Sequence, residues 1–284
     1  MNDTPTGKKV YVPPIKCQGI KTKIVHSIKE QIIWDRGGKW IEPFLGSGVV
    51  LFNIVPEKAL VGDTNPHIID FYNKIKTGEI TSDIIRQSLT EEGKKLKENG
   101  EKYYYSVRER FNANGNPLDF LFLNRSCFNG VMRFNGGGRF NVPFGHKPDR
   151  FRAAYITKIV NQTKYVESVI SPDWKFLTSD WRKLLDKATP EDFVYMDPPY
   201  IGRHTDYFNK WTEQDAQELV EIVKTLPCPF IFSMWSKNAY RTNPHLKLWE
   251  GFKMVPISHF YHVGATENLR NKMEEVLIIG FPKS

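Results

Sequence analysis

Hydrophobic positions along the chain change their spacing several times, and each change predicts a different element. Between residues 22 and 33 apolar side chains recur at helical spacing, which predicts an amphipathic helix. Residues 40–41 lead through a glycine-containing turn at 42–48 into the apolar run 49–52, a pattern typical of strand, turn and helix. A second short strand is expected at 59–62, ending at Asp63. Strand, helix and strand joined by short links indicate a parallel unit of an α/β sheet.

This pattern is interrupted between about residues 65 and 170. Residues 65–112 look helical, whereas 124–150 are rich in Asn, Arg, Gly and Phe, which is typical of a loop or hairpin. Strand-like runs return at 175–177, 193–196, 229–232 and 275–281, and helices fit 181–187 and 212–225. We therefore expect a doubly wound, mostly parallel α/β core formed by 1–65 and 173–284. The insertion at 66–172 is expected to be mainly helical and to contain a β-hairpin.

Composition and charge favour one kind of binding partner and argue against several classes of protein. The 284 residues carry a formal net charge of +8, which favours a polyanionic partner, although a basic protein without one remains the alternative. The three cysteines are far apart, so neither a disulfide framework nor a metal site is expected. No apolar stretch is long enough to cross a membrane, and residues 1–9 lack a signal-peptide core, so we expect a cytoplasmic protein.

The first segment that suggests a functional site is the turn Glu42-Pro-Phe-Leu-Gly-Ser-Gly48. Glycines between a strand and a helix allow a cofactor to approach the backbone and the helix N-terminus. Asp63, at the end of the next strand, is suited to accept hydrogen bonds from ribose hydroxyls. Leu51 stands where a dinucleotide fingerprint would have its third glycine. An ordinary tight turn with a solvated aspartate is the alternative.

The second segment is Asp197-Pro198-Pro199-Tyr200, directly after an expected strand. Two prolines usually mark only a rigid turn. The amino group of adenine, however, is a poor nucleophile because its lone pair is delocalised into the ring. The Asp197 carboxylate and the Pro198 carbonyl can accept its two hydrogens and direct the lone pair at a sulfonium methyl, with proline fixing the geometry. Tyr200 can stack on a base turned out of the duplex.

Two further segments have the composition of a binding surface. Residues 124–134 combine Arg, Asn and Phe side chains that can read base edges, grip phosphates or wedge between bases. The alternative is a solvated basic loop with Phe128 and Phe134 anchored in the core. In the segment 13–21, Lys16 and Lys21 can meet the carboxylate of a bound amino-acid moiety, whereas solvated surface lysines are the default interpretation.

Taken in order, these segments resemble the Dam-like, α-class family of DNA adenine-N6 methyltransferases, and are closer still to its EcoRV-like modification branch. The resemblance is carried by the segments 12–23, 42–50, 63–67, 104–112, 119–130, 140–144 and 197–204. They span nearly the whole chain. Cys17 stands where the Dam pattern has tryptophan, and the hairpin has Phe and Val where Dam has Tyr and Leu.

The resemblance implies a Rossmann-like methyltransferase fold and a set of site residues. It implies an S-adenosylmethionine (SAM) pocket formed by Lys16, Cys17, Lys21, Glu42, Phe44, Gly46, Gly48, Asp63 and Asp180, bordered by Asp197. The catalytic set would be Asp197, Pro198, Pro199 and Tyr200. DNA contacts are expected from Asn124, Arg125, Asn129 and Arg133, with Phe128 at the intercalating position of the hairpin.

The function expected from these patterns is methyl transfer from SAM to N6 of a flipped adenine in double-stranded DNA. The resemblance suggests a monomeric modification enzyme of a restriction–modification system. Its target would be one such as GATATC, shared with an endonuclease that forms no stable complex with it. The alternatives are another methyl acceptor such as RNA adenine or a protein amide, a non-enzymatic DNA-binding protein, and a nucleotide-dependent oxidoreductase.

Overall fold

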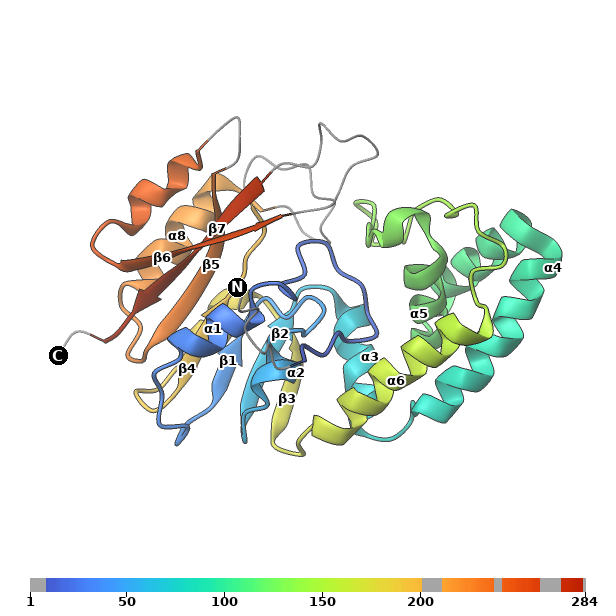
Figure 1. Cartoon of the computed structure of the whole chain (residues 1–284), viewed down its shortest axis with the longest axis horizontal. Coiled ribbons are helices and arrows are strands. Elements are labelled where there is room, and N and C mark those ends of the chain that lie inside the picture. The colour runs from blue at the N-terminus through green and yellow to red at the C-terminus, as the bar shows by residue number, and fades with distance from the viewer. Residues whose placement is uncertain (1–8, 201–210, 238–241, 261–271, 283–284) are drawn as a thin grey trace, which may run out of the picture.

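The parallel strands expected from the sequence lie side by side in one seven-stranded sheet (Figure 1). The computed structural model describes residues 9–200, 211–237, 242–260 and 272–282. The strand order is β3-β2-β1-β4-β5-β7-β6. Their bounds are β1 Trp40–Glu42, β2 Ala59–Asp63, β3 Trp174–Thr178, β4 Phe193–Met196, β5 Phe230–Lys237, β6 Lys253–Phe260 and β7 Lys272–Gly280. The five neighbouring strands β3, β2, β1, β4 and β5 pair in parallel, and β7 runs antiparallel to both β5 and β6.

Both faces of the sheet are buried, because successive side chains of its central strands are apolar and point to opposite faces. Trp40 and Val61 pack into one hydrophobic cluster with α1 (Val25–Gln31), α2 (Leu51–Ile54) and α3 (Pro66–Lys76). Ile41 and Leu60 point into a second cluster with α7 (Trp181–Leu185) and α8 (Glu213–Val223). Helices on both faces of a mainly parallel sheet confirm the expected doubly wound α/β fold.

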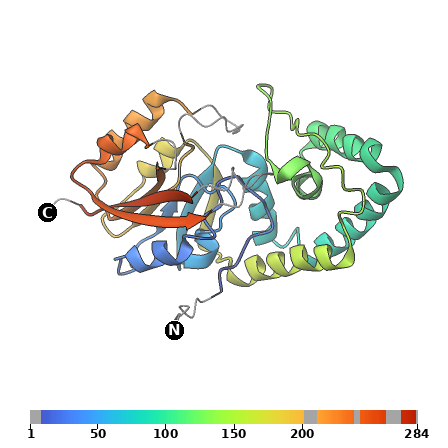
Figure 2. The same cartoon turned by 45° about the horizontal axis from the view of Figure 1, so that its top comes forward.

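The insertion between β2 and β3 forms a lobe beside the sheet (Figures 1 and 2). After α3, which packs on β2 and β3, come α4 (Ser82–Asn114), α5 (Pro117–Ser126), the short 3-10 helix η1 (Phe128–Gly130) and α6 (Ala153–Val169). The helix α4 packs against α5 and α6, and its path breaks at Gly100, where φ is 58°. The hydrophobic cluster around Trp40 continues into this lobe, so lobe and sheet share one core.

The expected hairpin is an antiparallel pair of segments joined by isolated bridges rather than by regular strands. Cys127 pairs with Phe144, and Phe134 pairs with Phe140. The turn between them is closed by the Asn135 side chain, whose carbonyl oxygen accepts hydrogen bonds from the backbone N–H groups of Gly137 and Arg139, each at 3.0 Å.

Two elements differ from the sequence-based expectation. The strand β6 was not expected, because its sequence contains Pro256 and polar residues; it is an edge strand, where proline is tolerated. The expected loop from 124 begins inside α5, a helix whose residues are almost all buried, so no amphipathic pattern reveals it. The short 3-10 helix η2 (Pro244–Trp249) completes the described elements. None of the described helices is both long and apolar enough to span a membrane.

Candidate active site

A large cavity opens where the carboxyl ends of β1, β2 and β4 meet. In an open α/β sheet, ligands bind outside these ends, at the point where the strand order reverses. The cavity has a volume of about 1070 Å³. Predicted site residues that line it are Lys16, Cys17, Lys21, Glu42, Phe44, Gly46, Asp63, Arg125, Asn129, Asp180, Asp197, Pro198, Pro199 and Tyr200. The predicted residues outside its lining are Gly48, Asn124, Phe128 and Arg133.

The glycine turn after β1 is tied to the end of β2. Gly46 and Gly48 have φ values of 52° and 74°, a backbone region that favours glycine. The Gly46 N–H donates to Oδ2 of Asp63 at 2.9 Å, and the Asn65 N–H donates to Oδ1 at 2.8 Å. A carboxylate has lone pairs for further bonds, so these contacts fix Asp63 at the cavity wall without saturating it. Burial raises the pKa of Asp63.

Glu42 and Phe44 belong to the same turn and line the cavity. Oε2 of Glu42 accepts a hydrogen bond from the Trp40 indole at 2.9 Å, and the side chain is buried. Burial raises the pKa of Glu42 to about 8. Phe44 meets Trp211 edge to face at 5.6 Å and stacks beside Trp181 at 6.3 Å. The sequence reasoning missed Trp211, which extends this aromatic wall.

Asp197 lies at the end of β4 with its two oxygens in different environments. Oδ1 accepts from the Lys21 ammonium at 3.0 Å, from the Ser233 hydroxyl at 3.1 Å and from the Tyr200 hydroxyl at 3.3 Å. No described residue donates to Oδ2. Desolvation raises the pKa of Asp197, while the Lys21 ammonium lowers it. The carboxylate is therefore held by one oxygen and offers the other to the cavity.

Lys21 lines the cavity, and its ammonium contacts groups of the protein there. Its buried ammonium donates to the Tyr200 hydroxyl at 2.7 Å and to the Gly19 carbonyl at 3.1 Å, in addition to its ion pair with Asp197. It also lies 3.7 Å from Oε2 of Glu275 on β7. We call Asp197 together with Lys21, Tyr200, Ser233 and Glu275 the Asp197 cluster. The backbone of Lys16 is instead bonded to the side-chain amide of Asn124. No sequence pattern around Lys21 or Glu275 predicts their contact, because the two residues lie far apart along the chain.

Asn124 and Arg125 are buried and bind the N-terminal segment to α5. The Asn124 amide accepts from the Lys16 backbone N–H at 2.8 Å and donates to the Lys16 carbonyl at 2.9 Å. The Arg125 guanidinium donates to the Pro14 carbonyl at 2.7 Å and to Gln162. Their exposed fractions are only 0% and 3%, so neither side chain is available in this structure to contact DNA as predicted.

The hairpin presents the remaining predicted DNA-binding residues. Phe128 is 49% exposed, whereas Phe134 is buried against Phe140, so only the second phenylalanine is a core anchor. Asn129 has a left-handed backbone with φ of 55°. The Arg133 guanidinium donates to the Asn141 side chain at 2.8 Å and to its carbonyl at 3.1 Å, across the hairpin.

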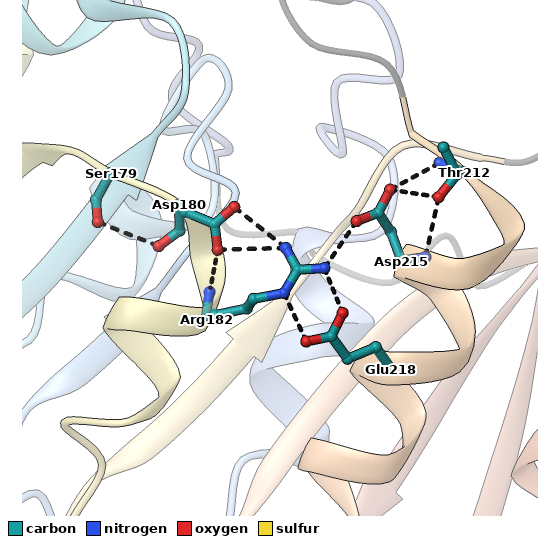
Figure 3. A network of polar contacts seen from close by, with 6 residues as sticks. All are labelled: Ser179, Asp180, Arg182, Thr212, Asp215 and Glu218. Atoms are coloured by element: carbon teal, nitrogen blue, oxygen red, sulfur yellow. Dashed lines mark hydrogen bonds and ion pairs between the residues drawn. The ribbon is translucent and has the colours of Figure 1, made fainter.

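A polar network that no sequence pattern predicted lies beside Asp180 (Figure 3). Asp180 caps α7 by accepting from the Arg182 N–H at 2.9 Å. The Arg182 guanidinium then contacts Asp180 at 3.2 Å, Asp215 at 2.8 Å and Oε1 of Glu218 at 2.7 Å. This arginine joins the start of α7 to α8 and fixes Asp180 at the cavity rim. Of the motif 197–204, residues 201–204 lie outside the described part of the chain.

Fold and site together define a doubly wound α/β enzyme with a cofactor-sized cavity and an Asp-Pro-Pro-Tyr segment at its wall. Comparison with known families makes this class specific. The model of the D12 class N6 adenine-specific DNA methyltransferases matches residues 18–263, and the chain belongs to that family. The protein is therefore an adenine-specific DNA methyltransferase, and its substrate class is DNA.

Curated relatives match along most of their length. The type II methyltransferase M.MjaIII of Methanocaldococcus jannaschii is 32% identical, covering 86% of this chain and 90% of the relative. A DNA adenine methylase of Serratia marcescens is also 32% identical, covering 75% and 77%. A DNA adenine methylase of Vibrio cholerae is 28% identical, covering 94% and 95%.

Proposed function

We propose that the enzyme transfers the methyl group of SAM to N6 of an adenine turned out of duplex DNA. The observation that carries this proposal is the divided environment of Asp197. Its Oδ1 is held by donors from three different parts of the chain, while Oδ2 faces the cavity without a described donor. An oxygen held in this way is a pre-positioned acceptor for an amino group.

The cavity walls fit the proposed donor. SAM supplies an electrophilic methyl group on a sulfonium and carries a net positive charge, and carboxylates at the cavity wall suit such a ligand. Asp63 and Asp180 would accept from hydroxyl and amino groups, the aromatic wall around Phe44 would flank the adenine ring, and Lys16 would face the carboxylate. Cys17, Glu42 and Gly46 complete the lining, and Gly48 shapes the turn behind it.

The chemistry assigned to this chain is positioning of the amine. Asp197 Oδ2 and the Pro198 carbonyl accept the two N6 hydrogens, which turns the nitrogen lone pair toward the methyl group. Pro199 keeps the carbonyl and the carboxylate in fixed relation, and Tyr200 lies beside the base. The amine proton becomes acidic only after the nitrogen has been alkylated, so Asp197 acts first as an acceptor and only afterwards receives a proton.

The hairpin and the net charge of +8 support DNA binding by the lobe. Phe128 is exposed and is suited to wedge beside the extruded base, with Asn129 and Arg133 next to it on the hairpin. We further propose that the protein is a monomeric modification enzyme of the EcoRV type with the target GATATC, protecting it against an endonuclease that forms no stable complex with it. Relatives named type II methyltransferase and modification methylase support a modification role.

The function is tested by incubating purified protein with SAM and mixed-sequence duplex DNA, then mapping modified adenines by long-read sequencing. We expect N6-methyladenine at one short sequence. A different sequence would reject GATATC alone, whereas no modified base at all would reject the activity. An equimolar RNA competitor that receives methyl groups at the same rate would reject selectivity for duplex DNA.

Replacing Phe128 by alanine is expected to slow methyl transfer about 10-fold, because the flipped state loses the side chain that fills the gap in the base stack. A fluorescent adenine analogue at the target position would report less extrusion, with donor binding unchanged. Phe281→Ala is the matched control, since Phe281 is similarly exposed, at 50%, just beyond β7. Equal extrusion by the Phe128 variant and the wild type would remove the wedge role.

A further inference from the structure

Glu275 is an acidic residue buried within an apolar strand. The strand β7 lies between β5 and β6, and its following residues, 276–279, are buried and hydrophobic. Glu275 pairs with Trp235 of β5, is 1% exposed and lines the cavity. A carboxylate at such a position is costly unless it meets a cation or hydrogen-bond donors. A cation within reach among the described residues is Lys21, whose ammonium lies 3.7 Å from Oε2 of Glu275.

Lys21 therefore lies between two carboxylates that come from different strands. Asp197 at the end of β4 is 3.0 Å from the ammonium, and Glu275 on β7 is 3.7 Å from it. With both acids ionised, the three side chains carry a net charge of −1. Without Glu275, Lys21 and Asp197 would form a neutral pair. The difference is a whole charge inside a largely desolvated site, where electrostatic interactions are much stronger than in water.

That charge matters for the reaction proposed at Asp197. During methyl transfer, positive charge moves from the donor sulfur onto the target nitrogen, which Asp197 Oδ2 would hold. The Lys21 ammonium fixes the other oxygen but repels the charge that develops on the nitrogen. A second carboxylate beside the ammonium offsets this repulsion while leaving the ammonium in place as a hydrogen-bond donor.

We propose that Glu275 is a positioning residue for methyl transfer, which holds the Lys21 ammonium and compensates its charge, so that the Lys21–Asp197 pair can face a developing cation. The inference rests on the proposed role of Asp197 as the acceptor of the target amine. It assigns no contact between Glu275 and the substrate. It predicts that the role of Glu275 depends on the presence of Lys21.

The first measurement is the single-turnover rate of methyl transfer by Glu275→Gln, which keeps the shape and removes the charge. We expect the rate to fall 10-fold or more, with the KM values for DNA and donor within about twofold of the wild type. Glu274→Gln is the matched control. Glu274 is the preceding residue on β7 and contacts Ser236 and Lys237 outside the Asp197 cluster, so its variant should keep the wild-type rate. A wild-type rate for Glu275→Gln would overturn the proposal.

The second measurement separates charge compensation from a general structural role. Lys21→Met removes the cation, and the double variant Lys21→Met/Glu275→Gln should be no slower than Lys21→Met alone. Losses that multiply in the double variant would overturn the proposal. Glu275→Asp keeps the charge and should recover more than half of the lost activity on a logarithmic scale; a loss equal to that of Glu275→Gln would overturn it too.

Thermal unfolding shows whether each variant is folded. Should Glu275→Gln fail to fold, the comparison between Lys21→Met and the double variant decides, because the double variant leaves neither charge of the pair unpaired in the site. The wild type measured alongside separates a failure of the proposed function from a failure of the role of Glu275. An inactive wild type would reject the proposed function, whereas an active wild type with an equally active Glu275→Gln would reject only the role of Glu275.

Discussion

Asp197→Ala is expected to lose methyl transfer to DNA by a factor of about 10³ or more, because it removes the acceptor that orients the target amine. Asp197→Asn should lose a similar amount. If its carbonyl oxygen keeps the contacts of Oδ1 with Lys21 and Ser233, its amide nitrogen replaces Oδ2 and presents hydrogens to an amine that needs an acceptor. Shape is kept in that variant, so the loss would report the acceptor role.

The measurement is transfer of a labelled methyl group to duplex DNA, with donor binding followed separately by calorimetry. Donor affinity should change much less than the rate, because Asp197 acts on the acceptor. Asp186→Asn, an exposed acid at the end of α7, is the control and should match the wild type. Methylation by Asp197→Ala at more than a tenth of the wild-type rate would reject the mechanism.

The second large effect concerns stability and its dependence on pH. The pKa of Glu42 is raised by burial from 4.5 to about 8 in the folded protein. In the unfolded chain the carboxyl ionises near its ordinary pKa, so between these two values the unfolded state holds fewer protons than the folded state. The free energy of unfolding contributed by this group therefore falls as pH rises from about 4.5 to 8, by an amount on the order of 3–5 kcal/mol.

Glu42→Gln is expected to remove this loss, since an amide can still accept from the Trp40 indole and does not ionise. Denaturant unfolding without donor should show the variant and the wild type equal near pH 4, and the variant more stable by several kcal/mol at pH 9. Glu191→Gln, at an exposed acid before β4, should leave the curve unchanged. A constant difference between variant and wild type at all pH values would show that Glu42 does not titrate in this range.

Local sequence patterns predicted those elements in which apolar residues are buried and polar residues are exposed. The strand after the glycine turn and the strand before Asp197 are short apolar runs, because both faces of the sheet are buried. The helices at 181–187 and 212–225 have the apolar periodicity that burial on one face imposes. The helix α5 has no such periodicity, because the lobe surrounds it on nearly all sides. The edge strand β6 has too many polar residues to look like a strand by itself.

Contacts between distant segments could not be predicted in this way. Lys21 was predicted to face the carboxylate of a ligand, and in the structure its ammonium forms ion pairs with Asp197 and Glu275, which no local pattern indicated. Asn124 lies in a segment with the composition of a DNA-binding loop, yet its amide is used within the protein. Residue type indicated the kind of interaction correctly, whereas the partner depended on how sheet and lobe pack.

The two-way hydrogen bonding between the Asn124 amide and the Lys16 backbone has a consequence for engineering new target preferences. The lobe leaves the sheet after β2 and returns at β3, two adjacent strands, so a foreign lobe could be grafted there without altering the strand order. The same graft would sever the N-terminal segment from its amide partner. A working chimera must bring its own asparagine at that place, or keep α5 and exchange only the hairpin beyond it.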